Sequence, residues 1–231
     1  MAPLTLKERA LRVREHAAFN QELHRPIIVE FTGSPDAGKT TAIEAVRNFF
    51  RRLGYAVQKP QEGAEIYHFV PRTDPEFNIR TGIYQMSLVI DAKYDRNTDL
   101  VILDRGLYDP YYWMSYWHRK GKLDEAKTRF YQEFFTDEKW RVNIDACFFM
   151  TCEAQEVVRR NEVAIPLDDL GETTNPESVR TLVDLARDTY IHWERKGAPV
   201  HLLDTTHLST KEANSYCIER ALQIFEKRFA V

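Results

Sequence analysis

Cysteine is scarce in this 231-residue sequence, and long apolar runs are missing. The three cysteines, Cys147, Cys152 and Cys217, form no CxxC pair, so we expect core thiols rather than a disulfide framework or a zinc site. The charged start, MAPLTLKERALRVREHAAF, has no apolar segment of the signal-peptide kind, and no later run is long enough to span a bilayer. These absences predict a cytoplasmic protein that makes no membrane contact.

Clustered positive charge is also absent. The chain has 32 lysines and arginines against 35 aspartates and glutamates, a formal net charge of −3, and its basic residues are spread through the sequence. Nucleic-acid-binding surfaces usually concentrate basic residues, so we expect a small-molecule partner and no nucleic acid. The 7 histidines show no metal-ligand spacing, which argues against a metal site built from protein ligands alone.

Short β-branched runs alternate with longer helical patterns, which is typical of a parallel sheet covered on both faces. With 43% hydrophobic residues, the chain can bury a sizeable core. The predicted strands span residues 27–32, 55–59, 100–103, 146–151 and 200–203, and Ser209 or Thr210 would cap a final helix. The sequence therefore predicts an α/β fold with a doubly wound, five-stranded parallel sheet.

Residues 1–25 form a predicted amphipathic helical extension ahead of the first strand. Leu6, Ala10, Val13 and Ala17 recur on one face at helical spacing. This helix either packs on the domain that follows or joins a partner subunit, so a homodimer is one of two open alternatives.

The stretch GSPDAGKTT, Gly33 to Thr41, follows the apolar run PIIVEFT and precedes a helical pattern. It matches GxxxxGK[ST], in which glycines allow successive main-chain N–H groups to turn inward around an anion. Lys39 would reach the outer phosphates, and Thr40 would ligate Mg²⁺ at the start of the helix. The predicted cofactor-binding residues are Gly33, Ser34, Asp36, Ala37, Gly38, Lys39, Thr40 and Thr41. Since no NKxD-type guanine motif is found, ATP with Mg²⁺ is the expected cofactor.

A carboxylate and a guanidinium follow the third predicted strand, in LVILDRGLYD. The apolar run from Leu100 to Leu103 stops at Asp104 and Arg105, at the carboxyl end of a parallel strand, and ligands bind at that edge of such sheets. Asp104 could hold Mg²⁺ directly or through water, and Arg105 could clamp a phosphate or the acceptor group. Both residues are therefore predicted at the catalytic centre.

Four segments place the chain beside a known group of proteins. GSPDAGKTT, QEGAEI, DRGLYD and EAQEVVRRNE follow the first four strands. In this order of elements, residues 26–229 resemble the P-loop small-molecule kinases, especially deoxynucleoside kinases and thymidylate kinases, and related AAA-labelled kinase-like domains. The resemblance implies strand order 2-3-1-4-5, a kinase domain over residues 26–231 and a helical lid over about residues 159–178.

The resemblance also implies a general base. Glu62 matches the glutamate that acts on the acceptor hydroxyl in deoxynucleoside kinases, and Glu65, one helical turn on, is its rival. A carboxylate within hydrogen-bond reach can orient a hydroxyl and accept its proton.

Arginines in the fourth segment match those that lead into the lid in these kinases. There they stabilise charge on the transferring phosphate while closure excludes water. Arg159 or Arg160 would act in this way, with Arg180 and Arg187 as alternative donors. His207 lies in a loop that contacts adenine in many relatives.

Substrate choice depends on the segments at residues 67–94 and 107–122. The second segment is rich in aromatic residues suited to stacking a ring, Tyr108 among them. Gln85 matches a glutamine that pairs with the base edge in deoxynucleoside kinases. Arg72 and Arg80 could serve an acceptor that already carries a phosphate.

The sequence thus predicts a Mg²⁺-dependent ATP phosphotransferase that acts on a nucleoside, a nucleoside monophosphate or a similar small molecule. The alternative is a nucleotide-binding regulatory ATPase that controls a protein partner through its N-terminal helix. The absence of an obvious effector domain and the aromatic segment after DRG favour the kinase.

Overall fold

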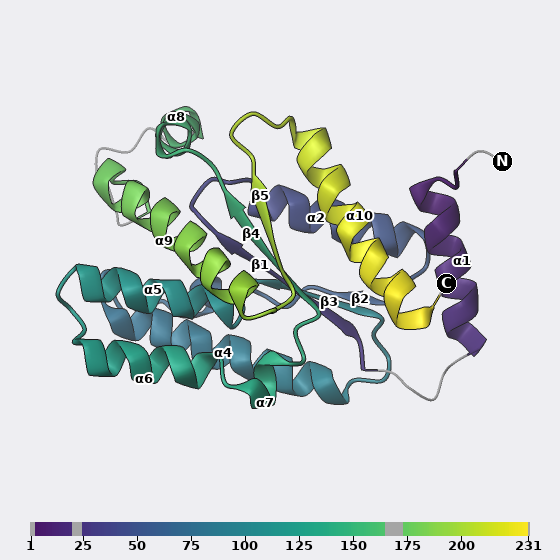
Figure 1. Ribbon diagram of the computed structural model, residues 1–231, viewed down its shortest axis with the longest axis horizontal. Helices are drawn as coiled ribbons and strands as arrows, with labels where there is room; N and C mark the ends of the chain where they lie inside the picture. The colour runs from purple at the N-terminus through teal and green to yellow at the C-terminus, as the bar shows by residue number, and fades with distance from the viewer. Residues whose placement is uncertain (1–2, 20–24, 165–172, 231) are drawn as a thin grey trace.

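Five parallel strands form a single sheet at the centre of the computed structural model, which describes residues 3–19, 25–164 and 173–230 (Figure 1). The strands are β1 (Ile27–Gly33), β2 (Val57–Gln58), β3 (Leu100–Asp104), β4 (Ala146–Thr151) and β5 (Val200–Asp204), in the order β2-β3-β1-β4-β5. All four pairings are parallel. The predicted fold class and strand order 2-3-1-4-5 are confirmed.

Strand β2 is shorter than the predicted span 55–59, and its neighbours explain why. The N–H of Tyr55 donates to the carbonyl of Phe50 at the end of the preceding helix, so Tyr55 is still part of the turn. Pro60 has no N–H to donate to a ladder, so strand pairing stops before it. Only Val57 and Gln58 pair with β3.

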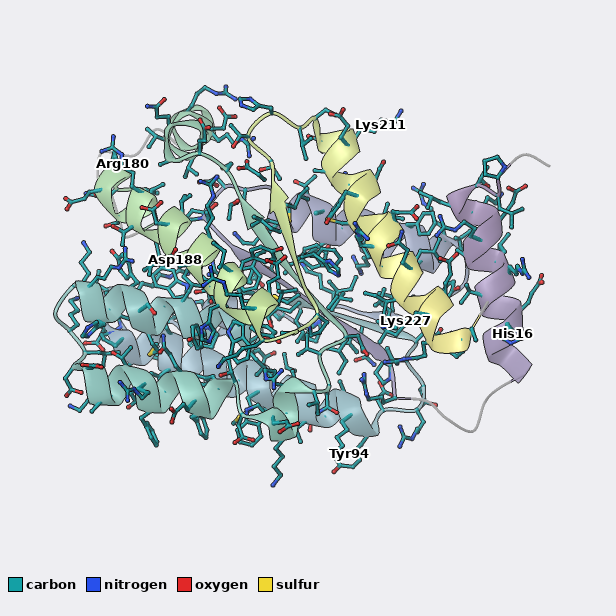
Figure 2. All side chains as sticks on the ribbon, in the orientation of Figure 1. His16, Tyr94, Arg180, Asp188, Lys211 and Lys227 are labelled. Carbon is teal, nitrogen blue, oxygen red and sulfur yellow. The ribbon has the colours of Figure 1, made fainter. Side chains whose placement is uncertain are left out.

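Helices cover both faces of the sheet (Figure 1). The helices α2 (Lys39–Arg52), α10 (Thr210–Phe229) and α1 (Leu6–Phe19) lie on one side, whereas α4 (Pro75–Tyr94), α5 (Tyr108–Arg119) and α9 (Pro176–Arg195) lie on the other. The remaining helices are α3 (Gly63–Ile66), α6 (Glu125–Phe135), α7 (Glu138–Arg141) and α8 (Ala154–Ala164). Charged residues such as Asp188, Lys211 and Lys227 are exposed on α9 and α10 (Figure 2).

Alternation along β1 divides the core into two layers. Ile27, Val29 and Phe31 belong to the cluster that includes α2 and α10, whereas Ile28 belongs to the cluster on the α5 and α9 side. Because successive side chains of a strand point to opposite faces, Glu30 falls on the same face as Ile28, where it is fully buried. A carboxylate thus sits within an apolar layer of the sheet.

The N-terminal helix packs on its own domain. Arg9 on α1 forms ion pairs with Glu219 at 2.8 Å and Glu226 at 2.7 Å, both on α10. The hydroxyl of Tyr55 donates to the carbonyl of Ala10 at 2.7 Å. The N-terminal helix therefore packs on the domain that follows it, which is one of the two alternatives that the sequence left open. The homodimer stays a prediction.

The three cysteines are buried. Among the residues that the structure describes, no helix is both long enough and apolar enough to cross a membrane.

The lid predicted over residues 159–178 has its centre at residues 165–172, outside the described part of the chain. That lid and the domain boundaries at residues 25 and 26 remain predictions.

Candidate active site

The GSPDAGKTT stretch forms a turn that joins the carboxyl end of β1 to α2. Gly33 and Gly38 have φ angles of 120° and 85°, which L-residues with a side chain rarely adopt. A Cβ at Gly33 would lie 2.0 Å from the carbonyl oxygen of Met150 on β4. Asp36, with φ of 49°, is also left-handed, and Asp tolerates this conformation better than most residues. The glycine positions predicted from the motif are therefore required by the backbone path.

Lys39 folds back over this loop. Its Nζ donates to the carbonyl of Ser34 at 2.5 Å and lies 3.4 Å from that of Gly33. Burial, reinforced by the charge of Arg105, lowers the pKa of Lys39 to about 8. The loop thus encloses an ammonium group at the N-terminus of a helix, and Thr40 and Thr41 stand exposed beside it. These features fit a polyphosphate with a divalent cation.

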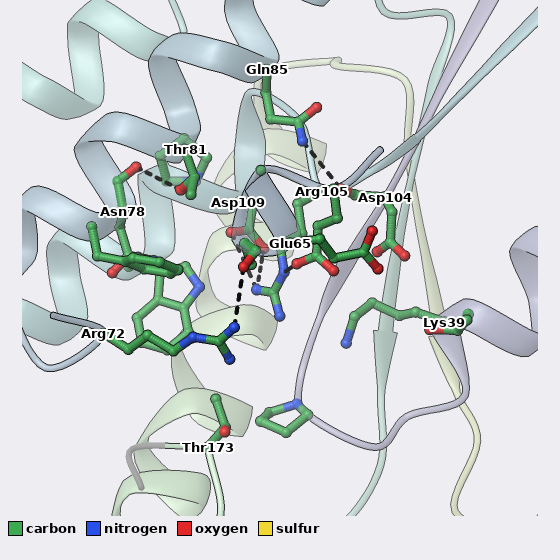
Figure 3. A pocket seen from close by; sticks show the side chains of 18 of the residues that line it. Lys39, Glu65, Arg72, Asn78, Thr81, Gln85, Asp104, Arg105, Asp109 and Thr173 are labelled. Atoms are coloured by element: carbon green, nitrogen blue, oxygen red, sulfur yellow. Dashed lines mark hydrogen bonds and ion pairs between the residues drawn. The ribbon is translucent and has the colours of Figure 1, made fainter. Parts of the chain in front are cut away.

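Arg105 connects two carboxylates at the carboxyl edge of the sheet (Figure 3). Its Nε donates to Glu62 Oε1 at 2.6 Å, and its Nη1 donates to Asp109 Oδ1 at 3.2 Å. Asp109 also accepts a hydrogen bond from Thr32 Oγ1 at 2.8 Å. Arg105 has a left-handed φ of 64°, and its N–H donates to the carbonyl of Phe31. Glu62 is therefore tied to the central strand through one guanidinium.

Asp104 lies at the end of β3, opposite Phe31 of β1 in the sheet register. Burial, together with the negative charge of Glu62, raises the pKa of Asp104, and Arg105 and Lys39 oppose this shift. A cation close to Asp104 would relieve the same repulsion. Asp104 is thus suited to holding Mg²⁺.

A cavity of about 910 Å³ brings most of the predicted residues together. Phe77 and Trp113 supply apolar surface, and Asn78 and Gln85 supply amides. The amide nitrogen of Gln85 donates to the carbonyl of Asp104 at 3.3 Å, while its Oε1 has no hydrogen-bond partner within the described residues. The predicted residues that line this cavity are Asp36, Gly38, Lys39, Thr40, Thr41, Glu62, Glu65, Arg72, Gln85, Asp104, Arg105 and Arg160.

A second cavity of about 670 Å³ lies on the other side of the loop. Ala37, Arg159 and His207 line it, and Arg160 lines both cavities. Arg160 donates to the carbonyl of Asp36 at 2.9 Å. Asp36, Gly38 and Thr41 of the loop also line both cavities. The loop and Arg160 therefore form the common border of the two spaces.

The arginines considered for the lid occupy different surroundings. Arg159 pairs with Glu156 at 2.7 Å, and Arg160 shares the same carboxylate at 2.8 Å. Arg187 pairs with Asp204 at 2.7 Å, and Arg180 projects outward from α9 (Figure 2). Of these four, only Arg160 reaches the cavity that contains Glu62.

Two predicted substrate residues lie elsewhere. Arg80 is exposed and its guanidinium stands over the ring of Tyr67, 4.1 Å from its centre. Tyr108 is fully buried and packs edge-on against Trp193 at 5.3 Å. Neither residue is among those lining the two cavities.

Sequence reasoning missed the residues that support Arg105. Asp109 holds its Nη1, and Thr32 holds Asp109. Glu30 accepts main-chain N–H groups from the start of α5. The one local signal was a glutamate inside the apolar run PIIVEFT, because an unpaired charge is rare in a buried strand.

The sequence matches no protein-family model and no curated protein, whereas the fold is similar to solved structures of deoxyadenosine kinase from M. mycoides. The structure with the products dCMP and a flexible dCDP bound gives a TM-score of 0.59 at 17% identity, covering 85% of this chain and 100% of that chain. The structures with bound dCTP and bound dATP each give 0.55 at 16% identity, covering 85% and 84% of this chain and 100% and 99% of those chains. The chain thus shares the fold of a deoxynucleoside kinase, as the motif resemblance implied.

Proposed function

We propose that this protein is an ATP-dependent kinase that transfers a phosphoryl group to a hydroxyl of a nucleoside. One observation carries the proposal. Lys39 of the phosphate-binding loop, Asp104 at the sheet edge and the Glu62–Arg105 pair all line the same cavity. A donor cradle, a cation ligand and a base thus share one space, which is what in-line phosphoryl transfer requires.

The residues present fit Mg·ATP. The turn at residues 33–38, the Lys39 ammonium and the N-terminus of α2 would hold the polyphosphate, and Thr40 and Asp104 would hold Mg²⁺. Bound there, Mg·ATP supplies the phosphoryl group. The cavity that contains Arg159 and His207 would receive the nucleotide's base.

Glu62 is the proposed general base. It lines the cavity together with the loop, and its side chain is held by Arg105 at 2.6 Å. A positioned carboxylate can orient an acceptor hydroxyl and take its proton. Arg105, fixed at its other end by Asp109, would keep that carboxylate aimed while presenting positive charge to the reacting centre.

The charges on the acceptor side favour an uncharged acceptor. Arg105 is already shared between Glu62 and Asp109. Arg72 is exposed at the margin and donates to the main-chain carbonyl of Ala64. An acceptor phosphate would need a positively charged recess, so a nucleoside fits better than a nucleoside monophosphate.

The walls suit a nucleoside base. Phe77 and Trp113 offer aromatic surface, and the amides of Asn78 and Gln85 offer hydrogen-bonding groups. Deoxyadenosine kinase, with the same fold, binds dCMP, dCTP and dATP in its solved structures. That likeness supports a nucleoside as the acceptor.

The test is ³¹P NMR of the purified protein with Mg·ATP and two separate pools, one of nucleosides and one of nucleoside monophosphates. A new phosphate monoester in the nucleoside pool is expected. A new diphosphate in the other pool would show that the acceptor class is wrong. ADP and free phosphate alone would favour the regulatory ATPase.

A further inference from the structure

Glu30 is a buried carboxylate outside the cavity, and the proposed mechanism does not use it. It lies at the middle of β1, opposite Leu103 of β3 and Cys147 of β4. Its exposed fraction is 0%. Carboxylates in such apolar surroundings are costly unless their oxygens are hydrogen-bonded, so its partners reveal its role.

Those partners are three consecutive main-chain N–H groups at the beginning of α5. Leu107 donates to Oε2 at 2.9 Å, Tyr108 to Oε1 at 3.0 Å, and Asp109 to Oε1 at 3.1 Å. Burial raises the pKa of Glu30 to about 8, and these donors partly offset that shift. Both carboxylate oxygens are therefore occupied by the helix N-terminus, which carries partial positive charge.

The residue before this turn leaves room for the carboxylate. A Cβ at Gly106 would lie 2.5 Å from Glu30 Oε2 and 2.6 Å from its Cδ. The glycine of DRG is thus required by contact with Glu30. Residues 30 and 106 are complementary in size.

Two active-site residues flank this contact. Arg105 precedes Gly106, and Asp109 is one of the three N–H donors. The Asp109 side chain is also held by Thr32, two residues after Glu30 on the same face of β1. Alternate side chains of the central strand therefore hold both the main chain and the carboxylate at the start of α5.

We infer that Glu30 is a positioning residue, which fixes the first turn of α5 so that Arg105 and Asp109 hold Glu62 in the reactive orientation. This role rests on the proposed kinase function only for its effect on turnover. The geometric part, from Glu30 to the Arg105 side chain, stands independently of the substrate.

The variants follow from the two contacts. In Glu30→Gln an amide NH₂ replaces one oxygen and faces an N–H donor, because both oxygens accept hydrogen bonds. In Gly106→Ala the change is made on the other side of the contact, where the new methyl group forces the Glu30 carboxylate aside. The double variant Glu30→Ala/Gly106→Ala removes the carboxylate that the new methyl group would meet. Asp124→Ala is the control, because Asp124 caps α6 through Lys127 N and lines neither of the two cavities.

The first readout is the NMR signal of the Arg105 Nε–H, assigned by its loss in Arg105→Lys. Glu30→Gln and Gly106→Ala should each shift this signal, whereas Asp124→Ala should leave it in place. Gly106→Ala should add no further shift in the Glu30→Ala background, because coupled sites are not additive. An unmoved signal in folded Glu30→Gln, or additive effects in the cycle, would overturn the inference.

The second readout is turnover with the nucleoside that the wild type phosphorylates. A small displacement of catalytic groups can cost about 100-fold, so kcat should fall by about that factor while the Kd for Mg·ATP changes by less than about threefold. Equal losses in kcat and ATP binding would indicate general damage to the fold and contradict a positioning role. If no nucleoside is phosphorylated, the proposed function fails, while the Arg105 signal still decides the role of Glu30.

Discussion

Arg105 Nε lies 2.6 Å from Glu62 Oε1, although the two residues are 43 positions apart in the chain. The guanidinium also contacts Asp109, whose side chain is only 5% exposed. Hydrogen bonds between charged groups are short and directional. The proposed base is therefore aimed by an arginine that is itself anchored to the sheet.

Replacement of Glu62 by Gln should remove catalysis while preserving ATP binding. The amide cannot accept the proton of the acceptor hydroxyl, so kcat should fall by about 10²–10⁴-fold. Glu65→Gln is the matched control, because Glu65 lines the same cavity and is exposed. Steady-state kinetics and calorimetric ATP binding provide the measurement. Unchanged turnover in Glu62→Gln would remove Glu62 from the mechanism, and a larger loss in Glu65→Gln would assign the base to Glu65.

Replacement of Arg105 by Lys should impair acceptor use more than ATP binding. A lysine keeps the charge but cannot serve Glu62 and Asp109 in one planar geometry. Loss of one charged hydrogen bond, about 1.5–3 kcal/mol, corresponds to a roughly 10–100-fold lower kcat/KM for the acceptor. The kcat/KM for the acceptor should be compared with the Kd for Mg·ATP. Equal losses in the two would remove Arg105 from acceptor positioning.

ATP binding should take up a proton at pH 8. Burial lowers the pKa of Lys39 to about 8 in the free protein, and bound phosphates would raise it by favouring the ammonium form. Uptake of about half a proton per ATP is then expected at pH 8, and the affinity should fall as the pH rises from 7 to 9. Calorimetry in two buffers of different ionisation enthalpy measures the number of protons taken up when ATP binds.

The control for this prediction is Lys39→Arg. Its guanidinium stays protonated throughout this range, so any ATP binding that survives should lack the uptake. Wild-type binding without proton uptake at pH 8 would show that the free Lys39 is already fully charged.

The N-terminal helix should contribute to the stability of the domain. In Tyr55→Phe the buried hydrogen bond to the Ala10 carbonyl is lost. The free energy of unfolding should fall by about 0.5–1.5 kcal/mol, the net contribution of one hydrogen bond, as measured by urea denaturation, with the Kd for Mg·ATP unchanged. A matched loss of ATP binding would contradict a purely structural role for this contact.

Local patterns were sufficient for the sheet and for the loop. Strand β4 has the predicted bounds, because its run of apolar residues is buried on both faces. The positions of Gly33 and Gly38 could be predicted because the GxxxxGK[ST] motif requires glycines where main-chain N–H groups turn inward. Periodicity was less informative on α4, where Ile83, Ile90 and Tyr94 recur at helical spacing yet are 40%, 40% and 68% exposed. The spacing of apolar residues predicts a helix, but it does not show which of these residues other elements of the fold cover.

The partners of the site residues could not be predicted, since they come from distant segments. Glu30 meets the start of α5 across 77–79 positions. Arg160 reaches the carbonyl of Asp36 across 124 positions. A single sequence carries no signal for such pairs, because each depends on which sheet edge and helix end the fold brings together.

The most direct test of the proposed function follows the γ-phosphate itself. The protein is mixed in excess with ATP labelled with ³²P at the γ position, Mg²⁺ and a nucleoside pool, and the products are separated within a single turnover. Label is expected in a nucleoside monophosphate with wild type, and almost none with Glu62→Gln. Label in orthophosphate alone, or equal transfer by both proteins, would contradict it.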